Sequence, residues 1–144
     1  MDLTEKLENR FLINQETMKE LKRENIHLVE GELESALMIR CYPLHIERVL
    51  DNLFNNATNA IPQEGGKLSI RSYRREGWAV AEITNTGQIS EEDKQRYLHG
   101  EGRGRGLHIT SRLVKLMGGK TEVEPEEGQT TFRVMFHLVV KENA

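Results

Sequence analysis

The sequence is poor in the residues that mark several classes of protein. It has one cysteine, Cys41, which excludes an internal disulfide framework and a cysteine-rich zinc site. Its 20 basic and 23 acidic residues nearly balance at a net charge of −3, which gives no bulk charge for nucleic-acid binding. No apolar run approaches the roughly 18 residues of a membrane span, and the first residues do not form a signal peptide. We therefore expect a cytoplasmic domain with no nucleic-acid partner and no direct membrane contact.

The rest of the composition is that of a soluble globular domain. The chain has 144 residues, of which 37% are hydrophobic and 30% are charged. Because this length suits one core, we expect residues 1–144 to form a single domain that is monomeric in isolation. Two clusters depart from the average composition: four asparagines lie between Asn52 and Asn59, and six glycines lie between Gly100 and Gly119.

Hydrophobic periodicity predicts three helices. The first occupies the N-terminal residues 1–25, with Asp2 or Thr4 as its cap, and the second covers residues 43–61 from Pro43 onward. The third covers residues 107–117 and ends at a pair of glycines. Ahead of this third helix, residues 86–106 are expected to form a polar loop, in which Ser90 and Asp93 are a candidate capping pair for one helical turn.

Alternating and β-branched runs predict six short strands. We place them at residues 26–29, 37–41, 67–75, 78–85, 120–124 and 130–140. Glu76-Gly77, between two of these runs, is typical of a two-residue hairpin turn. The order of elements predicts an α+β fold, in which the three helices cover one face of a mostly antiparallel sheet.

The clustered asparagines lie on the second predicted helix. Asn52, Asn56 and Asn59 are spaced i, i+4 and i+7, which places them in one polar stripe beside the apolar face. Four asparagines cost this helix on the order of 2 kcal/mol relative to alanine. Their oxygens can ligate a hard cation such as Mg²⁺, and their amides can donate to phosphate oxygens. These residues alone leave a binding site and a polar helix edge equally open.

The clustered glycines precede the third predicted helix, in the run Gly102-Arg103-Gly104-Arg105-Gly106-Leu107. Glycine lets backbone N–H groups approach a ligand, and a helix N-terminus favours anions. A phosphate cradle and a flexible basic loop are both compatible with this run. The pattern is not a P-loop, and it does not follow a strand as a dinucleotide-binding fingerprint does.

Taken in order, these segments resemble the GHKL ATPase superfamily, and most closely the ATP-binding catalytic (HATPase_c) domain of sensor histidine kinases. The matching segments are His45–Ala60 for the N box, Ile83–Ile89 for the first glycine box, Gly102–Leu107 for the second, and Gly118–Lys120 with Gly128–Phe132 for the terminal hairpin. The resemblance implies a Bergerat-type α/β sandwich that binds Mg·ATP between its helical layer and a lid, here residues 86–106.

The resemblance also implies a role for each site residue. Asn56 would ligate Mg²⁺ with help from Asn52, and these two asparagines would be the catalytic residues. Asn85 would contact adenine, and Thr130 would lie behind the adenine pocket. The complete ATP-binding set implied is Asn52, Asn56, Asn59, Asn85, Gly87, Ile89, Gly102, Arg103, Gly104, Arg105, Gly106, Leu107 and Thr130.

Three features distinguish this chain from relatives in the superfamily. Asn85 stands where most relatives carry an aspartate, and a neutral bond to the adenine amino group is weaker by about 1 kcal/mol. Asn52 stands where hydrolytic members carry a glutamate, so we expect very slow ATP hydrolysis. Tyr97-Leu98 is the candidate remnant of the aromatic F box in the lid.

None of the five histidines lies in a phosphoacceptor motif. The resemblance therefore implies the catalytic domain of a two-component sensor histidine kinase. This domain would donate the γ-phosphoryl group of Mg·ATP to a histidine on a separate hairpin domain, with a response regulator downstream. Two alternatives stay open: a serine kinase of the anti-sigma type, and a nonenzymatic nucleotide-sensing module.

Overall fold

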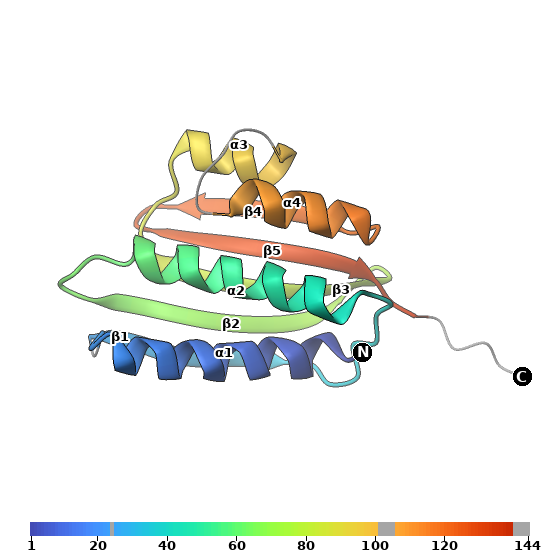
Figure 1. Ribbon diagram of the computed structural model, residues 1–144, viewed down its shortest axis with the longest axis horizontal. Helices are drawn as coiled ribbons and strands as arrows, with labels where there is room; N and C mark the ends of the chain where they lie inside the picture. Colours follow the sequence, from blue (N-terminus) through green and yellow to red (C-terminus); the bar gives the residue numbers. More distant parts are fainter. Residues whose placement is uncertain (24, 101–105, 140–144) are drawn as a thin grey trace, which may run out of the picture.

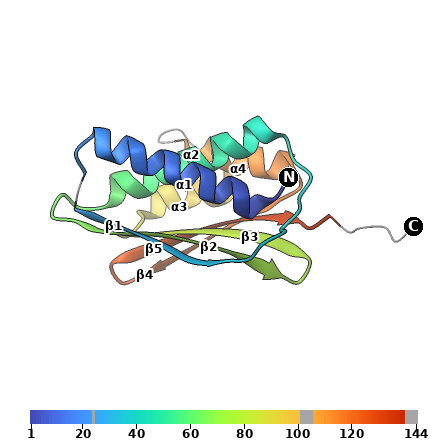
Figure 2. The same cartoon turned by 90° about the horizontal axis from the view of Figure 1, so that it is seen from below.

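The computed structural model describes residues 1–23, 25–100 and 106–139, and it forms a two-layer sandwich of helices on a sheet (Figures 1 and 2). In chain order the elements are α1 (Leu3–Glu20), β1 (Ile26–Leu33), α2 (Pro43–Ala60), β2 (Gly66–Arg75), β3 (Trp78–Thr86), α3 (Glu91–His99), α4 (Leu107–Leu116), β4 (Lys120–Glu126) and β5 (Gln129–His137). The α+β sandwich is therefore confirmed.

The five strands form one sheet in the order β1-β2-β3-β5-β4. β1 and β2 are parallel, which is possible because α2 provides the crossover between them. All other neighbouring strands in this sheet are antiparallel, as the sequence predicts. In the β3–β5 pair, Asn85 lies directly opposite Thr130, so two predicted site residues become neighbours across the sheet.

The helices pack side by side on one face of the sheet, in the order α1, α2, α4 and α3 (Figures 1 and 2). The core lies between the two layers, where apolar side chains of α2 such as Ile46, Leu50 and Phe54 are buried. On β5, alternate residues from Thr130 through Phe132 to Phe136 face the helices. The edge of this core, where α2 ends, is where the candidate site lies.

The first two helices begin as the sequence predicts. Asp2 caps α1 by accepting a 3.0 Å hydrogen bond from the Thr4 backbone N–H, and Pro43 opens α2. The bidentate pair between Arg10 and Asp51 joins the two helices, with Nε–Oδ1 and Nη2–Oδ2 distances of 2.8 and 2.6 Å.

The first helix is shorter than the sequence predicts. It ends at Glu20 and does not continue to residue 25. Lys22 adopts a left-handed backbone with φ of 57°, and the Arg23 N–H returns to the Met18 carbonyl. This local turn stops the helix, so Leu21 becomes exposed although its spacing fits the apolar stripe.

The structure has a fourth helix, α3, where the sequence predicts a polar loop with a single helical turn at Ser90. It begins because the Ser90 hydroxyl accepts from the Asp93 N–H at 3.2 Å, and it ends at Gly100 in a left-handed cap. The helix lacks an apolar stripe, since Tyr97 is the buried residue on it. Periodicity therefore gave no signal for it.

The expected strand at residues 37–41 does not form. Met38 and Ile39 make isolated bridges only, with Asp2 and Leu138 respectively. Leu37 and Ile39 produce the alternating hydrophobic pattern because both side chains are buried. The segment does not pair with a strand of the sheet along its length. By contrast, the hairpin turn at Glu76-Gly77 is confirmed, because both residues have positive φ, at 49° and 83°.

Candidate functional site

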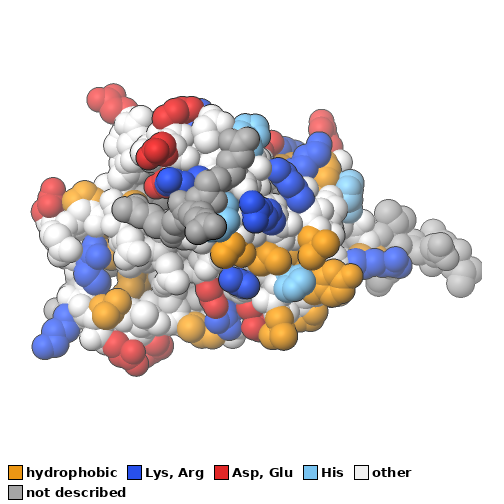
Figure 3. Space-filling model, turned by 45° about the horizontal axis from the view of Figure 1, so that its top comes forward, with side chains coloured by type: hydrophobic (Ala, Val, Ile, Leu, Met, Phe, Trp, Pro, Cys, Tyr) orange, Lys and Arg blue, Asp and Glu red, His pale blue; other side chains and the backbone are white. Residues whose placement is uncertain are grey.

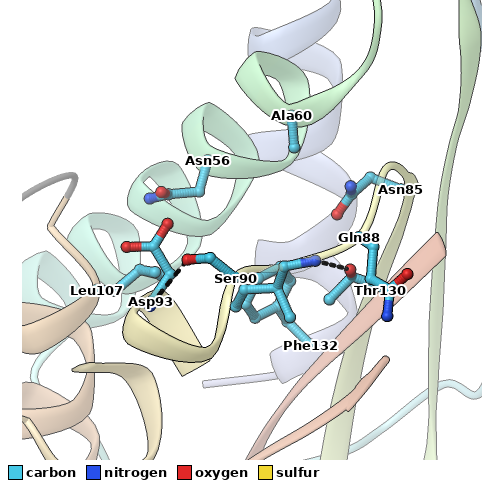
Figure 4. A pocket seen from close by; sticks show the side chains of 10 residues that line it. Asn56, Ala60, Asn85, Gln88, Ser90, Asp93, Leu107, Thr130 and Phe132 are labelled. Atoms are coloured by element: carbon cyan, nitrogen blue, oxygen red, sulfur yellow. Dashed lines mark hydrogen bonds between the residues drawn. The ribbon is translucent and has the colours of Figure 1, made fainter. Parts of the chain in front are cut away.

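A cavity of about 260 Å³ opens between the C-terminal half of α2, the starts of α3 and α4, the end of β3 and the start of β5 (Figure 4). Its described lining consists of Asn56, Ala60, Asn85, Gln88, Ile89, Ser90, Asp93, Leu107, Thr130 and Phe132. Five of the predicted site residues meet here: Asn56, Asn85, Ile89, Leu107 and Thr130. A larger groove of about 830 Å³, lined by residues such as Met38 and Leu138, contains none of them.

Asn85 presents a fixed hydrogen-bond acceptor at this cavity. Its side chain is 1% exposed, and its Nδ2 donates to the backbone carbonyls of Thr86 and Gly87 at 2.9 and 3.4 Å. Its Oδ1 is buried and has no partner among the described residues. A buried acceptor without a partner costs about 1–3 kcal/mol, so this atom fits a ligand that donates a hydrogen bond, as the amino group of adenine does.

Thr130 holds the turn that follows β3. Its hydroxyl donates to the Gly87 carbonyl at 2.8 Å and accepts from the Ile89 N–H at 2.9 Å. Gly87 has φ of 112°, and a Cβ placed there would lie 2.5 Å from the Ala60 carbonyl oxygen. The turn therefore packs directly against the end of α2, and only glycine fits at this position.

Only one of the three asparagines in the predicted stripe lines the cavity. Asn56 is 7% exposed and projects into the cavity, with its Nδ2 donating to the Asn52 carbonyl at 2.8 Å (Figure 4). Asn52 is half-buried and does not line the cavity. Asn59 is exposed and also lies outside the lining, because Ala60, four residues after Asn56, continues the same face.

The second glycine run is described only in part. Gly102, Arg103, Gly104 and Arg105 lie outside the described residues, so their predicted phosphate contacts stay predictions. Gly106 is the N-cap of α4, with φ of 75° and no side-chain hydrogen bond to the helix, and a Cβ there would lie 3.0 Å from the Asn52 carboxamide. The uncapped start of α4 therefore meets the asparagine helix, and its N–H groups suit an anion.

Sequence reasoning missed half of the described lining: Ala60, Gln88, Ser90, Asp93 and Phe132. Phe132 follows Thr130 by two residues on a strand, so simple alternation could have found it. Asn59 and Ala60 follow Asn56 by three and four residues, so helical spacing leaves both open. Ser90 and Asp93 were interpreted only as a helix cap. Their place in the cavity depends on how α3 packs.

Tyr97 anchors α3 on the sheet. Its ring is fully buried and meets Phe132 edge to face, with 5.0 Å between ring centroids. Its hydroxyl donates to the Arg133 carbonyl, and Thr121 Oγ1 donates to the Tyr97 carbonyl at 3.3 Å. Because Phe132 also lines the cavity, one aromatic contact joins the helix to the cavity wall.

The histidines lie away from the cavity lining. In the structure they occupy β1 (His27), the start of α2 (His45), the end of α3 (His99), the start of α4 (His108) and the end of β5 (His137). In the described part of the chain, no three acidic, histidine or cysteine side chains gather into a metal site. The Asn56 carboxamide and the Asp93 carboxylate are nevertheless oxygen donors of the kind that Mg²⁺ takes.

None of the helices that the structure describes is long and apolar enough to cross a membrane.

The chain is similar to known sensor kinases. It is 31% identical over 113 residues to sporulation kinase D of Bacillus subtilis, which covers 71% of this chain and 22% of the relative. It is 33% identical over 87 residues to the sensor histidine kinase DcuS of Escherichia coli, covering 55% and 16% respectively. The chain thus spans about a fifth of the length of these relatives.

Solved structures share the fold. The catalytic domain of histidine kinase ThkA superposes with a TM-score of 0.80 at 24% identity, over 96% of this chain and 95% of that domain. The mycobacterial sensor histidine kinase MprB gives a TM-score of 0.76 at 19% identity, over 96% and 95% of the two chains.

Residues 41–141 match the family model HATPase_c, described as histidine kinase-, DNA gyrase B- and HSP90-like ATPase. This match spans α2, the candidate cavity and the whole antiparallel part of the sheet. ATP is therefore the ligand that the family implies for the cavity. The chain therefore belongs to the HATPase_c family.

Proposed function

We propose that this chain binds Mg·ATP in the cavity and presents the γ-phosphoryl group to a histidine on a separate hairpin domain. The observation that supports this most is the Asn85 Oδ1 atom, which is buried at the cavity without a partner among the described residues. Its amide nitrogen is held by two backbone carbonyls, so the side chain offers an acceptor to the ligand. That is the chemistry needed to recognise the adenine amino group.

We assign the phosphate end of the ligand to the other side of the cavity. There Asn56 projects from α2, and α4 begins at Leu107 without a side-chain cap. When bound, Mg²⁺ would offset charge on the transferring phosphoryl group. Asn56 would hold the cation through its carboxamide, and the α4 N–H groups would orient the phosphates. Catalysis by these residues consists of positioning and electrostatics.

Hydrolysis by the domain alone should be very slow. Asn52 is neutral and cannot act as a strong general base. The neighbouring Asp51 is no substitute, because Arg10 binds both of its oxygens on the α1 side of the helix. A steady-state rate comparable with that of dedicated ATPases would contradict this assignment.

The first test is nucleotide binding by calorimetry in the presence and absence of Mg²⁺. The Asn56→Ala variant should lose about tenfold or more in affinity for Mg·ATP, because it lacks the ligating oxygen. The matched control is Asn55→Ala, which removes the exposed asparagine next to it on the same helix. Unchanged Mg·ATP affinity in a folded Asn56→Ala protein would remove the metal role of this residue.

A downstream partner and a cellular compartment follow from the proposed reaction. ThkA has been crystallised in complex with the response regulator TrrA, and we propose a response regulator downstream of this chain too. QseC, another structural neighbour, was solved as a cytoplasmic segment, and we propose the cytoplasm for this domain.

The phosphoacceptor hairpin needs a surface on which to dock. Hydrophobic side chains gather over the start of α2 and the end of α4 (Figure 3). We define this apolar surface by Tyr42, Leu44 and Leu116, whose exposed fractions are 60%, 76% and 64%. Exposed apolar patches of this kind typically mark interaction sites.

Phosphotransfer to a serine of a partner protein would instead favour an anti-sigma-type kinase, and ATP binding without any transfer would favour a sensing module.

A further inference from the structure

A groove of about 830 Å³ lies at the end of the sheet opposite the nucleotide cavity. Gly77, just before β3, lines this groove, whereas Asn85, near the end of β3, lines the cavity. The strand between them spans roughly 25 Å, at about 3.3 Å per residue. The N-terminus and the end of β5 also lie at the groove end of the molecule (Figure 1). A small ligand in the groove therefore does not touch a nucleotide in the cavity.

The groove presents apolar side chains on a fixed backbone. Met38 and Val139 line it and are 42% and 37% exposed. The Val139 N–H donates to the Met38 carbonyl at 2.9 Å, and Ile39 pairs with Leu138 in an antiparallel bridge. Because these contacts hold the two segments side by side, the apolar lining is formed before a ligand arrives. Covering it removes apolar surface from water, which favours a ligand with an apolar chain.

The charged side chains in the described lining of the groove are two arginines, Arg40 and Arg74. Arg74 is already bound within the protein, because its Nε donates to Glu34 Oε2 at 2.7 Å and its Nη2 to the Ala36 carbonyl at 3.1 Å. Arg40 is exposed, and its guanidinium has no hydrogen bond or ion pair among the described residues. The groove thus combines an apolar wall with one uncompensated positive charge.

We propose that this groove binds a small amphipathic carboxylate, such as a fatty acid, with the carboxylate on Arg40 and the chain along the apolar wall. A planar guanidinium matches a carboxylate through two parallel hydrogen bonds. A phosphate dianion would require a second free cation, and Glu34 already binds the other arginine. Small-molecule sites of about 300–1,000 Å³ typically combine an apolar lining with a few polar groups. The inference is independent of the proposed function, because the groove is remote from the cavity.

The test is a titration of the whole chain at neutral pH with octanoate and with octanol, followed by the NMR shifts of the Ile39 and Leu138 amides. The wild-type chain should bind octanoate about tenfold more tightly than octanol, because a hydrogen-bonded charge is lost with the carboxylate. Arg40→Ala should lose this preference and bind octanol as the wild type does. Arg48→Ala is the matched control, because it removes an exposed arginine of α2 outside the groove lining. It should change neither affinity by more than about twofold.

A second variant tests the apolar wall. Met38→Ser changes an exposed side chain, so the fold should tolerate it, and it should weaken both probes by about fivefold. Octanoate that shifts neither groove amide, or that binds Arg40→Ala as tightly as the wild type, overturns the inference. So does a wild-type dimer that Met38→Ser dissociates in sedimentation, because it assigns the groove to a second copy of the chain. Each of these outcomes leaves Mg·ATP binding, and with it the proposed function, intact.

Discussion

Asn85 offers the ligand only an acceptor, because two backbone carbonyls occupy its Nδ2. The chain should therefore prefer ATP over ITP, in which an exocyclic carbonyl oxygen replaces the amino group, by at least about tenfold. Asn85→Leu should reduce ATP affinity and abolish this preference, since the acceptor is gone. Competition binding with both nucleotides measures this. Asn59→Ala, at an exposed position outside the cavity lining, serves as the control. Equal affinity of the wild-type chain for ATP and ITP would contradict the adenine assignment.

At the scale of elements, Glu82 links strands β2, β3 and β5 on the sheet face opposite the helices. It accepts from Tyr73 Oη at 2.5 Å and from Arg133 Nε at 2.6 Å, and Arg71 lies 3.2 Å away. Burial raises the pKa of Glu82, but the hydrogen bonds from Tyr73 and Arg133 outweigh burial and lower it below its ordinary value of 4.5. The charged form therefore stabilises the folded state.

This depressed pKa predicts how stability changes with pH. A group whose pKa is lower in the folded state stabilises the fold above the unfolded value, and the stabilisation is lost as pH falls through the folded value. Urea denaturation should show a loss of stability below about pH 4.5. Glu82→Gln should cost about 2 kcal/mol at pH 7 and flatten this acid dependence. Glu124→Gln, which removes a half-exposed partner of Arg133, should cost less than about 1 kcal/mol. If Glu82→Gln lost stability at low pH in the same way as the wild-type protein does, the contacts of Glu82 with Tyr73 and Arg133 would not be the source of the acid dependence.

At the scale of the whole molecule, the apolar surface and the cavity are separate features that share α2 and α4. The prediction is that Leu116→Ser and Leu44→Ser slow phosphorylation of a histidine hairpin supplied in trans, for example that of sporulation kinase D, by about tenfold. Mg·ATP affinity should stay unchanged, because neither residue lines the cavity. Leu12→Ser makes the same kind of change on the exposed side of α1 and should not affect transfer. Equal transfer rates for all three variants would place the docking surface elsewhere.

The sequence predicted most of the fold because local signals and packing agree there. α2 carries a strong apolar stripe that starts at Pro43, and the Glu76-Gly77 turn has the residues its backbone needs. The wrong predictions, at the end of α1, in α3 and at residues 37–41, lie where the local pattern and the packing differ. In α3 only Tyr97 is buried, so periodicity was silent, and at residues 37–41 the alternation reports burial without sheet pairing.

The candidate site was predictable at positions where the backbone or the helical spacing requires a particular residue. Only glycine fits at Gly87, and the spacing of Asn56 follows from the period of a helix. The choice between Asn59 and Ala60 as the next residue on the cavity side was not predictable. It depends on how α2 is rotated against β3 and α3, which residues outside the helix decide.

The sequence by itself determined the family, the order of the elements and the asparagine and glycine segments, because these depend on residue type and local spacing. Only the tertiary structure decided that Asn85 Oδ1 has no partner among the described residues and that Asp93 joins the cavity lining. Both results follow from contacts between segments that are distant along the chain. The hydrogen bonds and packing between these segments determine which polar atoms already have a hydrogen-bond partner and which are available to a ligand.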